Sequence, residues 1–308
     1  MDPLSEVLAL LKPRSHVSGR FDVVRNQAIR FPAYDGIKCY AVIDGACWLS
    51  AEGVPDAILL EAGDCFLLPK GLSFTLATDL SQKPVDFDTF LATLRSGGGV
   101  LAESNSACYL AGGHFLLESN PADLLFGLLP PIVHLRTEPE KAAMRWSLDR
   151  MHEEVRNPQL GGSLVVQQLA YMMLVQALRT HLTVASPVGV GWLYALTDPN
   201  MKKAIACIHN DPSNLWTVSG LAERAGMSRS IFALQFKRTV GATPMEYLTR
   251  WRMLLAGDRL RNSADSVSMI AASLGYDSES AFGKAFKRVI GSSPRQYCRA
   301  VPVRGHSG

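Results

Sequence analysis

The spacing of apolar residues changes along this 308-residue chain. In residues 18–110, short apolar runs alternate with polar residues and are separated by the turn-forming segments DG, EGVP, AGD and PKG. A two-residue period places side chains alternately on the two faces of a strand, so this region predicts a β-barrel or sandwich. The predicted strands are FDVV, AIRF, IKCYAVI, ACWLS, AILLE, CFLLP and SFTLA.

Two long helices are predicted after the strands, over residues 139–156 and about 163–182, because apolar residues recur there at helical spacing. The second helix is apolar on nearly all sides, which is typical of a deeply buried helix or of a subunit interface. Its apolar residues include Leu169, Met172, Met173, Val175 and Leu178. We expect a homodimer through this helical segment; the alternative is that the methionines belong to the core.

A fourteen-residue segment occurs twice in the last third of the chain, as QFKRTVGATPMEYL at 235–248 and as AFKRVIGSSPRQYC at 285–298. Each copy lies at the end of a predicted pair of helices. The expected N-terminal caps are Thr217, Ser228, Ser266 and Ser278, and the glycines that end the helices are Gly226, Gly241, Gly275 and Gly291. A helix, a short turn and a second helix form the helix-turn-helix unit, whose second helix enters the major groove of DNA.

The second helix of each pair has a predicted buried face. This face comprises Ile231, Phe232, Phe236 and Val240 in the first pair and Ala281, Phe282, Phe286 and Ile290 in the second. A helix over residues 244–262 joins the pairs. Its length of roughly 28 Å is close to the ~34 Å between successive major-groove faces of B-DNA, so the two units are expected to read adjacent grooves. Helical pairs also stack in protein-binding solenoids, but those generally need three or more units.

Charge is distributed unevenly between the two ends of the chain. From Pro199 onward there are 16 Lys and Arg against 7 Asp and Glu, whereas residues 1–198 contain 15 against 21. A basic surplus in the helix-turn-helix region is the electrostatic feature that binding to a phosphate backbone requires. We therefore expect double-stranded promoter DNA as the partner.

Residues 201–299 resemble the DNA-binding domain of the AraC/XylS family of bacterial transcription regulators. The resemblance rests on A-G-M-S-R-S-x-F, on F-K-R-x-x-G-x-x-P-x-x-Y at 236–247 and on the second copy, which ends F-K-R-V-I-G-S-S-P-R-Q-Y. It implies a sequence-specific transcription regulator, expected to be an activator, with RNA polymerase as a further candidate partner. It also implies that the base-reading residues are Arg229, Ser230, Ala233, Leu234 and Gln235 in the first unit and Glu279, Ser280, Gly283 and Lys284 in the second.

One position departs from the family pattern. Relatives commonly have arginine where this chain has Leu234, so the guanine contact of an arginine is replaced here. Leu234 is expected to touch a thymine methyl, or Gln235 to reach an adenine. The expected phosphate contacts, which position the protein without reading sequence, are Lys237, Arg238, Lys287 and Arg288.

The segment GDCFLLPKGLSF resembles a cupin motif in which Gly63, Pro69 and Gly71 precede a metal-binding histidine. That last position is Phe74, and the glutamate ligand of a cupin falls at Lys38, with the paired histidines near residues 31–34. The resemblance implies a cupin-like barrel with no metal and no cofactor. One branch of the regulator family carries such a sensor domain before its DNA-binding domain.

Alternation places Lys38, Tyr40 and Val42 on the face that lines a cupin barrel, where they form the expected effector pocket with Phe74. Lys38 either meets an anionic small-molecule effector or lies near the barrel mouth with its ammonium in water. A redox-sensing regulator is an alternative, because the predicted barrel contains Cys39, Cys47 and Cys65.

The sequence carries no H-E-x-x-H, G-x-S-x-G or phosphate-loop signature, so the chain is not expected to be an enzyme. The alternative is a metal-free cupin enzyme fused to a DNA-binding domain. No apolar run reaches the ~20 residues of a membrane helix, and the N-terminal segment lacks the basic start of a secretory signal. The expected location is cytoplasmic.

Together these patterns predict an α+β multidomain protein. The expected parts are a cupin-like effector-binding barrel at 1–135, a helical dimerisation or packing segment at 136–185, a linker at 186–198 and an all-α domain with two helix-turn-helix units at 199–308.

Overall fold

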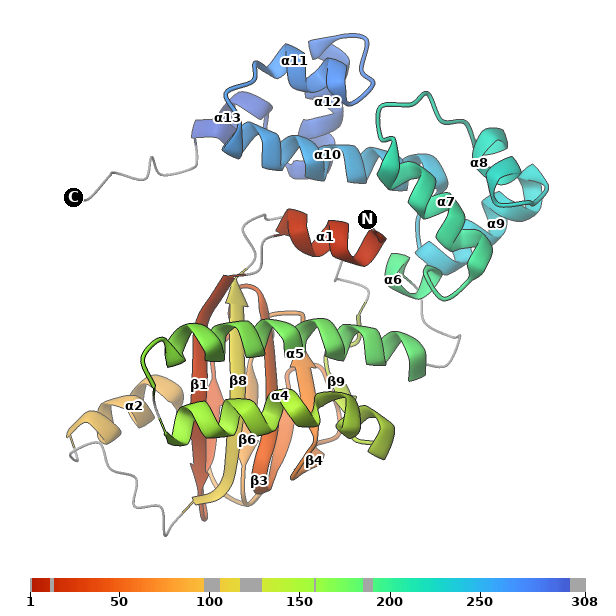
Figure 1. The fold of residues 1–308 in the computed structure, drawn as a ribbon. Coiled ribbons are helices and arrows are strands. Elements are labelled where there is room, and N and C mark those ends of the chain that lie inside the picture. The colour runs from red at the N-terminus through yellow and green to blue at the C-terminus, as the bar shows by residue number, and fades with distance from the viewer. Residues whose placement is uncertain are drawn as a thin grey trace. The chain divides into compact units, whose positions relative to one another are not determined.

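The computed structural model describes residues 2–11, 14–96, 106–116, 129–157, 159–184 and 191–299. Contacts divide the chain into two compact units, which are described separately (Figure 1). Among the described residues, the half-barrel unit comprises 14–96, 106–116, 129–157 and 159–184. The helical unit comprises 2–11 and 191–299.

The half-barrel unit is built on a curved sheet. Its strands are β1 (Arg14–Val24), β2 (Ala28–Phe31), β3 (Ile37–Ala51), β4 (Ile58–Glu61), β5 (Cys65–Leu68), β6 (Phe74–Ala77), β7 (Val85–Asp86), β8 (Ser106–Leu116) and β9 (Val133–Leu135). The main path of pairing is β1-β8-β3-β6-β2-β7, while β4 pairs with β3 and β5 pairs with both β3 and β9. The predicted β-strand pattern is therefore confirmed.

Strand β3 runs through the DG segment at which the sequence predicts a break, so that expectation is wrong. An irregularity in the pairing with β8 lies between Val42 and Asp44, and Gly45 has a φ of 76°. A bulge of this kind bends a strand without ending it. The first half of β3 pairs with β5 and β8, whereas the second half pairs with β4 and β6, so one strand supports both sides of the half-barrel.

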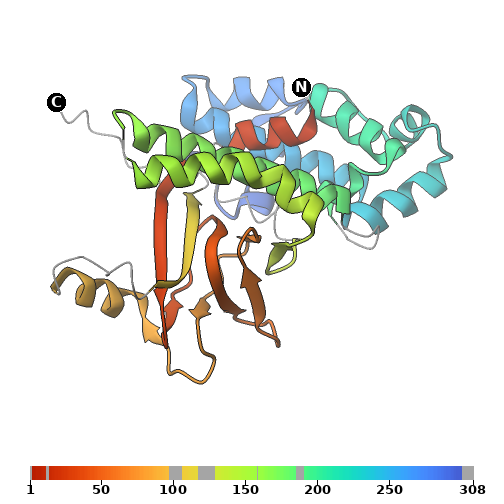
Figure 2. The ribbon, with the colours of Figure 1, turned by 60° about the horizontal axis from the view of Figure 1, so that its bottom comes forward.

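Two antiparallel helices cover one face of the sheet (Figure 2), as the apolar spacing predicts. They are α4 (Glu138–Arg156) and α5 (Gly162–Val184). Helix α5 contacts β1, β5, β8 and β9, and α4 contacts β3 and β8. Helix α5 is apolar on nearly all sides because it packs against both the sheet and α4. Three of its residues are fully buried: Met173, Leu174 and Ala177.

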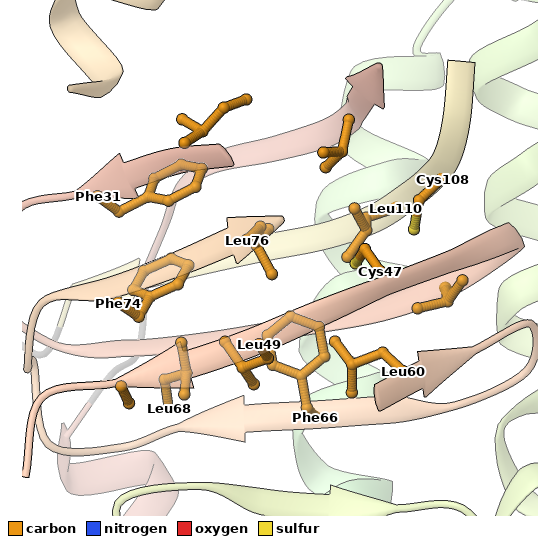
Figure 3. Close-up of a cluster of buried hydrophobic side chains, with 14 of the residues drawn as sticks. Phe31, Cys47, Leu49, Leu60, Phe66, Leu68, Phe74, Leu76, Cys108 and Leu110 are labelled. Carbon is orange, nitrogen blue, oxygen red and sulfur yellow. The ribbon is translucent and has the colours of Figure 1, made fainter. Parts of the chain in front are cut away.

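The inner face of the half-barrel carries a packed apolar core (Figure 3). Phe31 and Phe74 stack in parallel at 4.5 Å, and Phe87 stacks on Phe31 at 4.7 Å. Phe87 begins α2 (Phe87–Ser96), a helix that packs beside β2 and β7 and that the sequence patterns do not predict. The core also buries Cys47 and Cys108 from neighbouring strands.

The helical unit contains the repeated helix pairs. Its helices are α1 (Pro3–Leu11), α6 (Trp192–Ala195), α7 (Pro199–Asn210), α8 (Val218–Arg224), α9 (Arg229–Val240), α10 (Pro244–Asn262), α11 (Val267–Ser273), α12 (Glu279–Ile290) and α13 (Pro294–Arg299). The predicted connecting helix over 244–262 is thus confirmed as α10. No helix in the described part of the chain is long and apolar enough to cross a membrane.

Helix α1 belongs to the helical unit, although the sequence patterns predict a barrel domain over residues 1–135. It packs against α7 and α10 and buries Leu4, Val7 and Leu8. Helix α6 falls in the predicted linker at 186–198 and packs on α9. Its residues Trp192 and Leu193 are buried in the helical unit. Helices α4 and α5, predicted as a separate segment, lie within the half-barrel unit.

Candidate nucleic-acid interface

Each helix-turn-helix unit is shaped by its own caps and glycines. The side-chain oxygens of Thr217 and Ser228 accept hydrogen bonds from the amides of Gly220 and Ile231, which fixes where α8 and α9 begin. Ser266 and Ser278 do the same for α11 and α12. Gly241 and Gly291 end α9 and α12 with φ values of 80° and 89°, a conformation that only glycine adopts without strain.

Two buried phenylalanines orient each second helix. Phe232 and Phe236 of α9 are fully buried and contact each other, and Phe236 packs against Tyr247 of α10. Phe282 and Phe286 of α12 repeat this arrangement, with Phe286 against Tyr297. Because these rings hold one face of α9 and α12 inward, the opposite face of each helix is turned outward.

The outward face of α9 holds most of the residues predicted to read bases. Arg229 and Ser230 are exposed, Leu234 is 73% exposed, and Ala233 is half-buried. Gln235 is engaged elsewhere: its amide donates to the Asp198 carboxylate at 2.6 Å, so in this conformation it does not extend toward a groove. Asp198 in turn caps α7, and the hydrogen bond therefore ties α9 to the start of α7.

Helix α12 presents a different set of groups. Glu279, Ser280 and Lys284 are exposed, and Gly283 is half-buried with open space where a Cβ would be. Glu279 lies 3.5 Å from Arg295 in an exposed ion pair. The predicted phosphate contacts are all exposed in the last turns of the two helices: Lys237, Arg238, Lys287 and Arg288.

Two equivalent positions predicted to be buried, Ile231 and Ala281, are exposed instead. Ile231 is 59% exposed, because it lies one residue before Phe232 on the helix and the two side chains cannot both point inward. The equivalent residue of α12, Ala281, is exposed as well. Sequence spacing alone could not distinguish the exposed Ile231 from the buried Phe232, because each of them fits a three- to four-residue repeat of apolar positions.

Arg252 contacts both helix-turn-helix units. Arg252 of α10 donates to the backbone carbonyls of Pro212 and Asn214 at 2.6 Å and 2.9 Å, and its guanidinium lies over the Tyr276 ring. Gly275 approaches the same loop so closely that a Cβ would lie 2.2 Å from the carbonyl oxygen of Ser213. The spacing of the two recognition helices is thus fixed by close contacts as well as by α10.

A buried histidine joins α1 to this framework. His209 stacks on Trp251 at 3.8 Å, with Nε2 2.8 Å from the Tyr247 hydroxyl and Nδ1 3.1 Å from Glu6. Because an ionised carboxylate only accepts, Nδ1–H donates to Glu6 and the tyrosine donates to Nε2. Burial lowers the pKa of His209 to about 3, so the ring stays neutral. Nothing in the local pattern near Glu6 indicates a partner 203 residues away.

In the half-barrel unit, Lys38 stands at the position to which the cupin spacing assigns the glutamate ligand. Its Nζ lies 4.3, 4.8 and 5.1 Å from the ring centroids of Tyr34, Phe74 and Phe31. These are the residues that the cupin spacing places at the ligand positions. The side chain is 9% exposed, and no carboxylate among the described residues pairs with it. Burial lowers the pKa of Lys38 to about 8.

The remaining residues of the predicted effector pocket line the same face. Val42 and Phe74 are part of the packed core, and Tyr40 packs partly buried against Phe66. No group of three or more His, Cys, Asp or Glu side chains suited to a metal ion occurs in the described ranges. The cation that the structure shows here is the Lys38 ammonium itself, which faces the three aromatic rings.

A cavity of about 330 Å³ lies between α4 and strand β3. Its lining includes Val42, Lys141 and His152, but not Lys38, Tyr40 or Phe74. Lys141 is paired there with the buried Asp64 at 2.9 Å, and Asp64 also contacts His134 at 2.8 Å. Unlike Lys38, this lysine has a carboxylate partner.

Four cysteines are buried in the half-barrel: Cys39, Cys47, Cys65 and Cys108. The Cys39 thiol hydrogen-bonds to Cys65, and this contact together with burial raises its pKa well above the usual value. The pKa of Cys108 is raised in the same way by its hydrogen bond to Cys47 and by burial. Because the thiolate is the reactive form, Cys39 and Cys108 are poor nucleophiles in the folded protein.

Comparisons with known proteins agree with both units. A family model described as cupin matches residues 2–183, and a helix-turn-helix domain model matches residues 221–300. A putative AraC-like transcription regulator of Streptomyces lividans is 41% identical over 282 residues, covering 91% of this chain and 92% of that protein. A second, from Streptomyces antibioticus, is also 41% identical over 282 residues, covering 91% of this chain and 93% of that protein.

Solved structures include the DNA-binding domain of AdpA in complex with a target DNA, which is 32% identical. It covers 36% of this chain and 99% of that chain, with a TM-score of 0.33. The half-barrel, the paired helix-turn-helix units and the full-length relatives agree: this chain belongs to the AraC-like transcription regulators, with a cupin-family N-terminal region and a helix-turn-helix DNA-binding domain.

Proposed function

We propose that this regulator acts in the cytoplasm as a homodimer whose protomers each bind an asymmetric promoter site, under the control of an anionic small molecule that binds at Lys38. The observation that carries the DNA part of the proposal is the chemical difference between the outward faces of α9 and α12. Arg229 and Leu234 of α9 correspond to Glu279 and Lys284 of α12. Two helices with different side chains recognise different base sequences.

Roles on DNA follow from exposure and charge. Arg229, Ser230 and Leu234 of α9, and Ser280 and Lys284 of α12, are exposed where base edges would lie. Ala233 and Gly283 lie on the same faces and allow close approach of the helix to the groove. The exposed cations at the helix ends bind phosphates: Lys237, Arg238, Lys287 and Arg288.

In vitro selection tests the asymmetry. The full-length protein is mixed with a pool of duplexes that carry a randomised central segment, and bound duplexes are sequenced after several rounds. We expect each protomer's site to consist of two unlike elements about one helical turn apart. Lys284→Ala should relax the sequence preference in one element and Leu234→Ala in the other. If either substitution relaxes both elements equally, the two helices do not read separate sequences.

The effector part of the proposal rests on the surroundings of Lys38. A buried ammonium without a carboxylate partner is unfavourable, and ring faces at 4.3–5.1 Å offset only part of its lost hydration. An incoming carboxylate or phosphate would supply the missing counter-charge. Such a ligand changes DNA binding only through a difference in its affinity for the two functional states of the protein.

Thermal-shift measurements with monocarboxylates of increasing apolar size, each beside its neutral amide, test this site. We expect carboxylates but not amides to raise the melting temperature of the wild type, and Lys38→Met to abolish the shift. Lys141→Met is the matched control, because that lysine lines the 330 Å³ cavity instead. Loss of the shift in the Lys141 variant alone would place the effector in the cavity.

The dimer is proposed through the outer faces of α4 and α5. Trp146 of α4 is 66% exposed and Leu164 of α5 is 63% exposed, so both side chains would gain burial at a subunit interface. We expect light scattering to report a dimer for the wild type and a monomer for Trp146→Glu.

Activation further requires contact with RNA polymerase, which in vitro transcription from the selected site would reveal. The alternative is a metal-free cupin enzyme, which would convert the bound carboxylate into a product. A regulator should change transcription in response to the carboxylate and leave that molecule chemically unchanged.

A further inference from the structure

Two large apolar side chains project from the outer face of the first recognition helix. Ile231 is 59% exposed and Leu234 is 73% exposed. They are three residues apart, so they lie side by side on the surface of α9. Leaving both in water forgoes the burial that apolar side chains of this size normally gain.

Cations of the same helix surround this apolar pair. Arg229 precedes it, and Lys237 and Arg238 follow it in the last turn of α9. A neutral protein partner would gain little from these charges, whereas the phosphates on both sides of a DNA groove would pair with them. The combination of apolar centre and basic flanks therefore favours the major groove as the surface that covers the pair.

Within the major groove, the apolar group on a base edge is the C5 methyl of thymine. The neighbouring Gln235, which could otherwise contact adenine, donates its amide to Asp198 at 2.6 Å. The outer face of α9 thus presents few hydrogen-bonding groups beyond Arg229 and Ser230. Its chemistry matches methyl groups better than it matches the donors and acceptors of guanine or cytosine.

We propose that Ile231 and Leu234 together read the methyl groups of neighbouring thymines in the element bound by α9. This inference rests on the proposed asymmetric DNA binding and names the base specificity of one of its two helices. The corresponding residues of α12 are Ala281 and Lys284, which offer one small methyl group and one cation. The α12 element is therefore read without a paired methyl contact, and Lys284 is suited to the acceptors of guanine.

Uracil substitution tests the proposal, because it removes the thymine methyl and leaves the hydrogen-bonding groups of the base pair unchanged. The probe is the duplex recovered by in vitro selection with the full-length protein. Each thymine is replaced in turn by uracil, and affinity is measured by fluorescence anisotropy at fixed salt. We expect about a fourfold loss for each of two neighbouring thymines in the α9 element, the value for one buried methyl-sized group.

Alanine variants connect the methyl groups to the side chains. Ile231→Ala and Leu234→Ala should each bind the thymine duplex less tightly and lose sensitivity to uracil at one position. Leu215→Ala is the matched control, since Leu215 is 77% exposed in the same unit but lies outside α9. It should retain wild-type affinity and full sensitivity to uracil.

The outcomes separate this inference from the proposed function. Failure to select any duplex, with binding indifferent to salt, would overturn both. Tight, salt-dependent binding to an α9 element without neighbouring thymines would overturn the methyl proposal alone. So would a flat uracil scan, or unchanged uracil sensitivity in both alanine variants.

Discussion

Replacing Val7 by alanine should destabilise the helical unit, although residue 7 lies in the N-terminal segment that is predicted from sequence to belong to the barrel. Val7 is fully buried in α1, which packs against α7 and α10. The substitution removes two methyl-sized groups, worth about 1.6 kcal/mol in transfer free energy. Incomplete collapse of the cavity raises the expected cost to about 2 kcal/mol.

Hydrogen exchange followed by mass spectrometry resolves which unit is affected, because peptides from each unit are measured separately. At 1.4 kcal/mol per factor of ten, amides of α7 and α10 that open with this unit should exchange about thirtyfold faster in Val7→Ala. Val23→Ala is the matched control, since Val23 is fully buried in the half-barrel core. It should accelerate exchange in the strands and not in α7 or α10. Accelerated strand exchange in Val7→Ala, with α7 and α10 unchanged, would refute the assignment of α1.

Three further predictions concern charge and thiols. Replacing Lys237 and Arg238 by alanine should lower affinity for selected and unrelated duplexes alike and reduce the slope of log affinity against log salt by about two; a loss confined to the selected duplex would contradict their phosphate role. Burial lowers the pKa of Lys38 from its usual 10.5 to about 8 in the folded protein, so the unfolded chain binds more protons between these pH values and stability should rise with pH there by about 3 kcal/mol. Below pH 8 Lys38 is protonated in both the folded and the unfolded state, so it adds no pH dependence to the free energy of unfolding there. Urea unfolding from pH 7 to 10.5 measures the rise, and Lys38→Met should remove it. An equal rise in that variant would show that Lys38 is not its source. Iodoacetamide should label the exposed Cys298 in the folded protein and reach the four buried half-barrel cysteines only in denaturant, whereas their rapid labelling would support redox sensing.

Local patterns predict the parts of this fold in which neighbouring residues determine the structure. The helix caps at Thr217, Ser228, Ser266 and Ser278 could be identified from sequence because a cap bonds to amides two or three residues away. The convergence of Lys38, Phe74 and the residues at 31–34 could also be predicted, since the cupin spacing places them at one site.

Long-range packing could not be predicted in this way. The hydrogen bond between Glu6 and His209 depends on where α1 is placed, and no periodicity within α1 specifies its partner. The DG segment in β3 matches a common hairpin signal, but a bulge satisfies the same glycine conformation without reversing the chain. Spacing predicts a buried Ile231, which is exposed, because spacing does not say which of two adjacent apolar residues faces inward.

Hydroxyl-radical footprinting of the full-length protein on its selected duplex tests the central claim most directly. Because α9 and α12 are held at a fixed spacing by α10 and Arg252, each protomer should protect two stretches of sugar backbone about one helical turn apart, beside the two major grooves that the helices enter. The sequences of the two protected stretches should differ. Protection beside a single groove, or two identical elements bound by one protomer, would contradict the account.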